Sequence, residues 1–436
     1  MNRPIILGGG VAGIAAAMEL ADAGCKPILI ESRPYLGGRV RSFVHRETNE
    51  EIDNGRHLLM GCYHTTLNLL DRLGTGHHIS LQPALRVEFR DSDGSLDILS
   101  APSWLPSPLN VLVGMMGLRR LSLRERLGLI RVGLQAKREM PDKAETVTEY
   151  LLRLGQSSRV QERLWNPLVI ATLNTKPEEA SARLFVEVLR LAFLSSGDDS
   201  KLAFSHVGLS QLFSPAREYI ASRGGDVLLG CFASHVSRNG EEWHVELRDG
   251  RTFDTPTLLT ALPWGEFSTL FNKNIQGIFP PRHNPIISLY LWFDSVGGEL
   301  PDFSAMLGTS VEWMFNRRKI VGDREGESPA LIECVISAAD DICRMENSRI
   351  IAVVEEELRR AYPSLRSTPL LTAQVIKEKR ATFAATPSVE TIRPRPGYYS
   401  DGLFIAGDWT ATGLPGTIEG AVRSGVAAAR SLQRGK

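Results

Sequence analysis

A glycine-rich turn near the N-terminus constrains this chain more than any other feature. An apolar run at 4–7 precedes the turn, and an alanine-rich stretch at 14–23 follows it. Gly8, Gly10 and Gly13 give the turn a GxGxxG spacing. Gly8 permits a sharp bend, Gly10 lets the backbone approach a diphosphate, and Gly13 lets the helix pack closely on the strand. The helix N-terminus then offers unpaired N–H groups and a positive dipole end to phosphate oxygens.

An acidic residue at the end of the next strand indicates a dinucleotide. The apolar stretch 27–30 ends on Glu31, which lies 18 residues after Gly13. A carboxylate at that position can accept hydrogen bonds from a ribose diol. Because strand, glycine turn, helix and acid occur together, they predict a Rossmann-like nucleotide site rather than a glycine turn without a ligand.

A second glycine motif follows this acid. Gly37, Gly38 and Arg39 can add another contact to the same diphosphate, which simple NAD domains do not need. The motif resembles the GG element of the FAD-dependent amine oxidase and carotenoid desaturase superfamily, where the arginine lies close to the cofactor phosphates. The resemblance implies noncovalent FAD, with Gly38 and Arg39 among its ligands.

The C-terminal segment matches the same superfamily. A buried strand expected at 402–406 runs into Gly407 and Asp408, and a helix follows to about residue 432. The resemblance places the Asp408 carboxylate near the ribityl and phosphate groups. It also directs the backbone N–H groups of Thr417 and Ile418 at the flavin ring, where charge gathers on reduction.

These segments predict an α/β (α+β) fold of the amine oxidase type. Its discontinuous Rossmann-like FAD-binding domain would carry an inserted, mixed substrate-binding domain. A strand pattern around 224–247, with turns at 239–240 and 249–250, belongs to the first domain, and the resemblance puts the Ala233 backbone near the adenine. The expected division is 1–75, 205–265 and 395–436 for FAD, and 76–204 and 266–394 for substrate.

The DNGRH segment at 53–57 supplies the candidate catalytic residues. The superfamily has a (D/E)xGxH element near the flavin, so His57 is either a residue of the active site or a structural histidine that caps the turn. Arg56 stands where an uncharged amide is expected and adds a charge near the site.

A narrower resemblance rests on three blocks. They are 53–63, then 164–182 with its LWNPL and LNT motifs, and 408–425. Together they resemble the squalene-associated FAD-dependent desaturases, that is, the hydroxysqualene dehydroxylase family. Gly416 departs from that pattern, since alanine is common there.

The family resemblance implies a reaction, a substrate and partners. It implies reductive dehydroxylation of hydroxysqualene to squalene, in squalene and hopanoid biosynthesis, by hydride transfer from reduced flavin. The partner would be a long-chain isoprenoid, handed over by a squalene-synthase-like enzyme, and Arg56 or His57 would lie near its leaving oxygen. Alternatives are a phytoene or carotenoid desaturase, a flavin amine oxidase, and a lipid carrier that binds flavin without catalysis. The absence of an aromatic residue at 415–418 disfavours the amine oxidase.

Composition excludes several other classes. Lys+Arg and Asp+Glu both number 50, so a nucleic-acid binder with a general basic excess is not expected. The five cysteines form no CxxC pair, which predicts neither a disulfide framework nor a metal site. No signal peptide and no uncharged apolar run of about 18 residues is evident. We therefore expect a cytoplasmic protein, with any membrane contact peripheral and on the inner face of the cell membrane.

Segment 104–140 is the candidate for such contact. An apolar stretch leads into a helix opened by the capping box of Ser122 and Glu125. Seven basic and two acidic residues lie between 118 and 140, and Leu123, Leu127, Ile130 and Leu134 share one helix face. The pattern fits a membrane-surface helix, and it equally fits an ordinary amphipathic helix with a solvated basic face.

Overall fold

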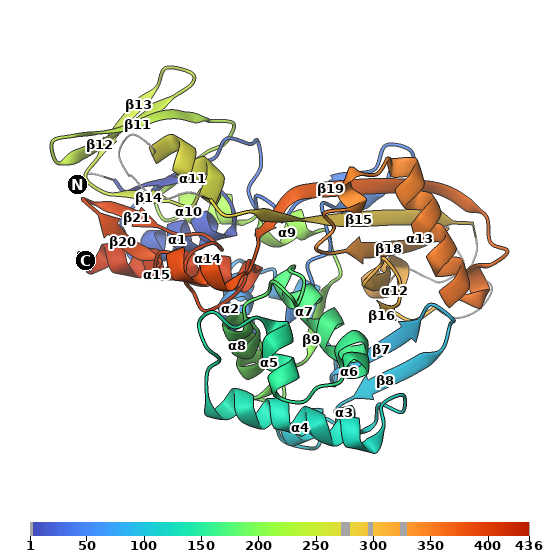
Figure 1. Ribbon diagram of the computed structural model, residues 1–436. Coiled ribbons are helices and arrows are strands. Elements are labelled where there is room, and N and C mark those ends of the chain that lie inside the picture. The colour runs from blue at the N-terminus through green and yellow to red at the C-terminus, as the bar shows by residue number, and fades with distance from the viewer. Residues whose placement is uncertain (1–2, 272–279, 295–299, 323–328, 436) are drawn as a thin grey trace.

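A computed structural model describes residues 3–271, 280–294, 300–322 and 329–435 (Figure 1). Three parts of the second expected insertion, 272–279, 295–299 and 323–328, lie outside these residues. Figure 1 shows two large sheets at opposite ends of the long axis, with a group of helices below them.

A six-stranded sheet unites the two ends of the chain. Its strands in spatial order are β10 (Asp226–Leu228), β2 (Ile28–Ile30), β1 (Ile5–Leu7), β14 (Leu258–Thr260), β21 (Leu403–Ile405) and β20 (Gly397–Ser400). All neighbours pair in parallel except β20 and β21, which are antiparallel. Short runs of Ile and Leu suit these strands because a parallel sheet is covered on both faces. The strands expected at 4–7, 27–30 and 402–406 are confirmed.

Two helices from opposite ends of the chain pack together beside this sheet. They are α1 (Val11–Asp22) and α15 (Ile418–Gln433). Gly425 makes the close approach possible, because a β-carbon there would lie 2.1 Å from the Ala12 carbonyl oxygen. The contact between α1 and α15 therefore holds together two segments from opposite ends of the chain.

A three-stranded antiparallel sheet follows β10. It consists of β11 (Ala233–Asn239), β12 (Glu242–Leu247) and β13 (Thr252–Thr255). Its two turns contain Gly240 and Gly250, with φ of +63° and +88°. Glycine adopts this left-handed conformation without strain, and both expected turns are confirmed.

The seven-stranded sheet at the other end has two different faces. Its order is β19 (Leu370–Phe383), β15 (His283–Phe293), β18 (Ala330–Ile336), β17 (Trp313–Asn316), β16 (Phe303–Leu307), β7 (Arg86–Asp91) and β8 (Leu96–Ser100). Leu289 and Leu291 of β15 face α13 (Asn347–Ala361) in one apolar cluster. Side chains alternate along a strand, so Ser288 and Tyr290 point to the opposite face.

A helical layer completes the fold. It contains α3 (Leu109–Met116), α4 (Leu123–Arg138), α5 (Val147–Arg153), α6 (Ser158–Val160), a π-helical turn (Gln161–Trp165), α7 (Asn166–Leu173) and α8 (Ala182–Phe193). The expected capping box opens α4: Ser122 Oγ accepts from the Glu125 backbone, and the Glu125 carboxylate accepts from the Ser122 backbone.

Shorter elements connect these layers. The strands are β3 (Ser42–Val44), β4 (Glu51–Asp53), β5 (Leu59–Met60), β6 (Ile79–Leu81) and β9 (Leu202–Ser205). The helices are α2 (His64–Arg72), α9 (Leu209–Phe213), α10 (Ala216–Ala221), α11 (Trp264–Phe271), α12 (Arg317–Val321) and α14 (Pro387–Ile392). None of the described helices combines the length and apolarity that a membrane crossing requires. The domain boundaries expected near 75, 205, 265 and 395 stay predictions.

Candidate cofactor and active site

The first glycine loop has the shape of a phosphate cradle. Gly8 has φ of +101°, and its N–H donates to the Ile30 carbonyl at 2.9 Å. A β-carbon on Gly13 would lie 1.9 Å from the Gly8 oxygen, whereas one on Gly10 would meet no atom within 4 Å. Gly13 thus serves packing, and Gly10 faces open space at the N-terminus of α1. The residues fit a diphosphate at this point.

Glu31 lies against the same loop. Its Oε2 accepts from the Gly9 N–H at 2.6 Å, and its Oε1 accepts from the Arg33 N–H at 2.7 Å. Ser32 Oγ also donates to Oε1 at 3.0 Å, so Oε2 is the oxygen that keeps a lone pair for an outside donor. The Cys231 N–H donates to the Glu31 carbonyl at 2.8 Å, which brings the neighbouring Ala233 to this side of the sheet. The structure therefore gathers the predicted ribose and adenine contacts in one region, and their roles stay predictions.

The second glycine loop rests on the first. The Gly37 N–H donates to the Gly9 carbonyl at 2.8 Å. Gly38 has φ of +63°, and a β-carbon on it would lie 3.2 Å from Gly10 Cα. Only glycine allows the two loops to come this close. The pairing of the GG motif with the GxGxxG turn is a property of the tertiary structure.

Arg39 links the second loop to the C-terminal segment. Its guanidinium donates to Asp408 Oδ1 at 2.7 Å and to the Ala381 carbonyl at 2.5 Å. The Asp408 carboxylate raises the pKa of Arg39 above its ordinary value. Gly407 has φ of +142°, and a β-carbon there would lie 2.5 Å from Trp409 Nε1. The two ends of the chain thus meet beside the cradle.

The N-terminus of α15 is capped by Thr417. Thr417 Oγ1 caps α15 by accepting from the Gly420 N–H at 3.0 Å, and the Thr417 N–H donates to the Pro415 carbonyl at 2.7 Å. The backbone of Thr417 is therefore already used within its turn. The predicted contacts of Thr417 and Ile418 with the flavin ring stay predictions.

Glu419 has a structural role that the sequence did not indicate. Helix α2 has no side-chain cap of its own at Tyr63. The buried Glu419 carboxylate accepts instead from the Thr65 and Thr66 N–H groups, at 3.2 and 2.9 Å. It supplies the negative charge that a helix N-terminus favours. No local signal in the sequence could reveal a cap that comes from the far end of the chain.

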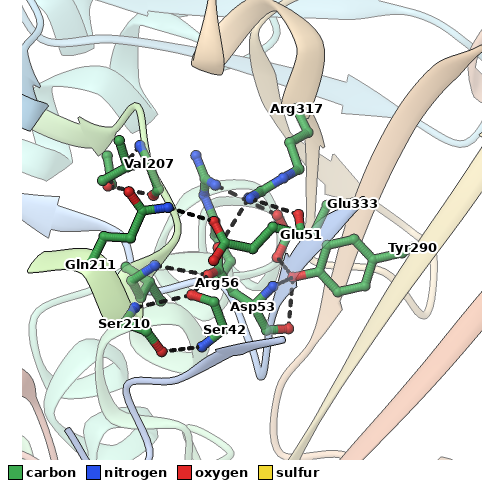
Figure 2. Close-up of polar contacts among 12 residues, drawn as sticks. Ser42, Glu51, Asp53, Arg56, Val207, Ser210, Gln211, Tyr290, Arg317 and Glu333 are labelled. Atoms are coloured by element: carbon green, nitrogen blue, oxygen red, sulfur yellow. Dashed lines mark hydrogen bonds and ion pairs between the residues drawn. The ribbon is translucent and has the colours of Figure 1, made fainter. Parts of the chain in front are cut away.

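Arg56 is buried against the seven-stranded sheet. Its side chain is 5% exposed, its Nη1 lies 3.6 Å from Glu333 Oε2, and its guanidinium lies over the Phe315 ring at 5.3 Å (Figure 2). Among the described residues, neither Arg56 Nη2 nor Glu333 Oε2 has a hydrogen-bond partner. A buried ionic group without a full set of partners is costly. The pair is therefore positioned to gain a polar ligand.

Tyr290 connects Glu333 to the DNGRH segment. Its hydroxyl lies 2.8 Å from Glu333 Oε1 and 3.0 Å from the Asp53 carbonyl, and it accepts from the Asp53 N–H at 3.2 Å. A phenol has one proton to donate, so with Glu333 ionised it satisfies one of these two acceptors at a time. Burial raises the pKa of Glu333, whereas the charges of Arg56 and Arg317 lower it, so the carboxyl pairs with Arg56 as an anion and takes up a proton more readily than an exposed carboxyl.

Asp53 has a structural role in this network. Its Oδ2 pairs with Arg317 at 3.0 Å, and its Oδ1 accepts from Ser42 Oγ and the Leu209 N–H (Figure 2). Arg317 also donates to the Glu51 carbonyl at 3.1 Å. These bonds fix the strand that leads into Arg56 and His57.

His57 is buried beside charged residues of the site. Burial, together with the charges of Arg39 and Arg56, lowers the pKa of His57 to about 4, against the opposing effect of Asp53. The imidazole is therefore neutral at pH 7. The structure brings His57, Arg56 and Arg39 into one neighbourhood. The predicted place of Arg56 or His57 near the leaving oxygen stays a prediction, and a neutral imidazole is poorly suited to donate a proton there.

Fold and site together define a class. Two stacked glycine loops, an acid after the second strand and a closing C-terminal strand and helix make this protein an FAD-dependent oxidoreductase. The chain belongs to the family described as flavin containing amine oxidoreductase, whose model matches residues 11–433.

Relatives narrow the comparison. The chain is 29% identical to a hydroxysqualene dehydroxylase of Rhodopseudomonas palustris over 431 residues, covering 97% of this chain and 96% of that one. It is 26% identical to the corresponding Zymomonas mobilis protein, over 98% of both chains. A 15-cis-phytoene desaturase of Narcissus pseudonarcissus is 26% identical, over 98% of this chain and 79% of the plant protein.

Solved structures support the fold. Cyclohexylamine oxidase of Brevibacterium oxydans superimposes with a TM-score of 0.72 at 15% identity, covering 100% of this chain and 99% of its own. An oxidoreductase of Methanosarcina mazei gives a TM-score of 0.74 at 14% identity, covering 99% and 100%. The predicted α/β fold of the amine oxidase type is thereby confirmed.

Proposed function

We propose that this enzyme removes the hydroxyl group of hydroxysqualene and releases squalene. The observation that supports the proposal is the similarity to hydroxysqualene dehydroxylases of three bacteria, at 26–29% identity over 97–98% of this chain and 96–98% of theirs.

The reaction balances with one hydride and one proton. When bound, the reduced flavin supplies a hydride. The allylic C–O bond breaks, the hydride forms a new C–H bond at an allylic carbon, and the departing oxygen leaves as water after taking up a proton. The protein has to hold a long hydrocarbon, exclude water and assist the departure of oxygen.

Arg56 is suited to assist that departure. Its buried Nη2 has no hydrogen-bond partner among the described residues, and its guanidinium lies over the Phe315 ring. A hydroxyl oxygen can fill the missing hydrogen bond, and in a low-dielectric site a fixed cation favours the developing negative charge. We assign Arg56 to the leaving oxygen.

Glu333 is the better proton source of the two acidic candidates at the site. Burial raises its pKa, while the Asp53 carboxylate is occupied by Arg317, Ser42 and a backbone N–H. In this scheme His57, neutral at pH 7, positions the bound molecules and does not donate a proton.

Single turnover under anaerobic conditions tests the proposal. Enzyme with its flavin reduced in advance is mixed with hydroxysqualene, while flavin absorbance is followed and the lipid product is identified by mass. Reoxidation of the flavin with formation of squalene is expected. A flavin that stays reduced, with hydroxysqualene unconsumed, overturns the proposal.

A desaturase that acts on phytoene is the second candidate. The similarity to plant phytoene desaturases over nearly all of this chain favours it. Oxidised enzyme mixed with phytoene would then become reduced and form a desaturated product, which the dehydroxylase would not do.

A further inference from the structure

The helical layer carries an apolar surface on its outer side. Six large apolar side chains of α3, α4 and the preceding turn are exposed there: Trp104, Leu109, Val113, Leu123, Leu127 and Leu134. Trp104 is 79% exposed, which is unusual for the largest apolar side chain. We call these residues the α3–α4 surface. Figure 1 shows α3 and α4 at the edge of the molecule, far from the six-stranded sheet.

Helix α4 has two apolar stripes, and the fold uses only one of them. Leu129, Val132 and Ala136 are buried against the protein. Leu123 and Leu127, which are 63% and 53% exposed, lie on the other side of the helix. A helix that needed only to pack on this domain would present polar residues there. The second stripe therefore indicates an apolar environment outside the protein.

Cations flank the exposed stripe in a regular row. Arg124, Arg131 and Arg138 are exposed and follow one another every seven residues, so they share one side of α4. Lys137 is exposed on the other side of the stripe. Both positions let a long side chain reach past the leucines toward negative charge.

Several other charges of this segment have partners within the protein. Arg120 pairs with Asp91 at 3.0 Å, and Arg126 donates to the Leu121 and Met116 carbonyls. Glu125 is bonded to Ser122 in the capping box, and Glu139 lies at the C-terminal end of the helix. The exposed side of α4 is thus apolar at its centre and positive at its margins.

We propose that the α3–α4 surface lies in the headgroup region of an anionic lipid bilayer, with the axis of α4 parallel to the membrane plane. The leucines and Trp104 would enter the boundary of the acyl chains, and the arginines would contact lipid phosphates. A second copy of the chain is a poorer occupant, because it would bring two arginine rows into one interface. The proposal holds whichever isoprenoid is the substrate.

Vesicle binding tests the proposal with three sets of variants. Purified holoenzyme is sedimented with phosphatidylcholine vesicles that contain or lack phosphatidylglycerol, at low salt. The apolar variant is Leu123→Gln/Leu127→Gln/Leu134→Gln, and the charge variant is Arg124→Gln/Arg131→Gln/Arg138→Gln. The matched control, Leu81→Gln/Leu371→Gln, alters exposed leucines elsewhere on the surface. All substituted side chains are exposed, so flavin content and unfolding temperature should not change.

The expected results distinguish the contribution of the exposed leucines to vesicle binding from that of the arginines. Wild type and the control variant bind vesicles that contain phosphatidylglycerol. The charge variant binds them on the order of 100-fold more weakly, since each cation near the surface contributes about 1 kcal/mol. The apolar variant shows no measurable binding. Failure of the wild type to bind anionic vesicles, or unchanged binding by both triple variants, overturns the proposal.

Trp104 reports the depth of contact. Brominated lipids should quench part of the tryptophan fluorescence of wild type, and Trp104→Phe should remove that part. Light scattering in the absence of lipid measures the oligomeric state and so tests the alternative that a second copy of the chain covers this surface. A dimer that the apolar variant converts to a monomer would show that a second copy covers the surface, and it would overturn the lipid assignment.

Discussion

The six-stranded and seven-stranded sheets position their functional residues by different means. In the six-stranded sheet, backbone groups make the contacts that position the site. The two glycine loops pack on each other, and the Gly9 N–H donates to the Glu31 carboxylate. In the second, side chains meet across strands, as Tyr290 of β15 meets its register partner Glu333 of β18.

The difference follows from what each region has to bind. A diphosphate has the same shape and charge in every flavoprotein of this type, so a fixed array of backbone N–H groups suits it. An isoprenoid presents few polar atoms, so recognition depends on which buried side chain is left without a partner. In the part of the chain that the structure describes, Arg56 Nη2 and Glu333 Oε2 are such polar atoms. Arg56 departs from the amide expected in its motif, and Glu333 belongs to no motif.

Breaking the buried pair should have the largest effect. Arg56→Met leaves the Glu333 side chain, which is 0% exposed, without its cation, and removing one member of a buried pair costs about 3–5 kcal/mol. We expect a loss of about 4 kcal/mol in the free energy of unfolding, measured with urea, while FAD binding persists. The double variant Arg56→Met/Glu333→Gln should recover part of that loss. A loss below about 1 kcal/mol for Arg56→Met would mean that the pair does not stabilise this region.

Two alanine substitutions one helical turn apart should separate packing from ligand binding in the nucleotide region. Gly13→Ala places a methyl group against the Gly8 oxygen and should destabilise the protein by about 3 kcal/mol in thermal unfolding. Gly10→Ala meets no protein atom, so the apoprotein should stay as stable as wild type while FAD affinity falls at least about tenfold. Equal stability of the two apoprotein variants would contradict this assignment.

The charge state of His57 predicts an effect of pH on stability. A folded pKa of about 4 lies below the ordinary value of 6.5, so the unfolded state binds the extra proton between these values. Stability should therefore be fully present above pH 6.5 and should fall as pH drops toward 4, by about 3 kcal/mol from this residue. His57→Gln should show a smaller loss over the same interval, measured by urea unfolding at each pH. An unchanged slope would exclude His57 as its source.

The ion pair between the two chain ends should have the smallest effect on stability. Asp408→Asn removes the partner of Arg39, whose side chain is about one-third exposed, so the expected loss is about 1 kcal/mol. FAD affinity, measured by fluorescence titration of the apoprotein, should nevertheless fall. Asp249→Asn breaks an exposed pair with Arg251 and is the matched control, with neither quantity changed. If Asp249→Asn lowers the FAD affinity as much as Asp408→Asn does, the effect of Asp408 on FAD binding is not local.

The local patterns allowed much of the nucleotide region to be predicted. Strand, glycine turn and helix at 4–23 were recognisable because turn geometry depends on the few residues that form the turn. The capping box of α4 was predictable for the same reason. The substrate region offered less, since residues that meet there come from separate strands, as Tyr290 of β15 and Glu333 of β18 do.

The sequence by itself determined the class of cofactor, the main elements of the α/β fold and the segments that contain the site. Only the tertiary structure decided that Glu333 faces Arg56, that Glu419 caps α2, and that one leucine stripe of α4 stays outside the core. Local structure depends on backbone geometry over a few residues, which a short motif can specify. Partners that are distant along the chain depend on strand register and helix packing, which no single motif contains.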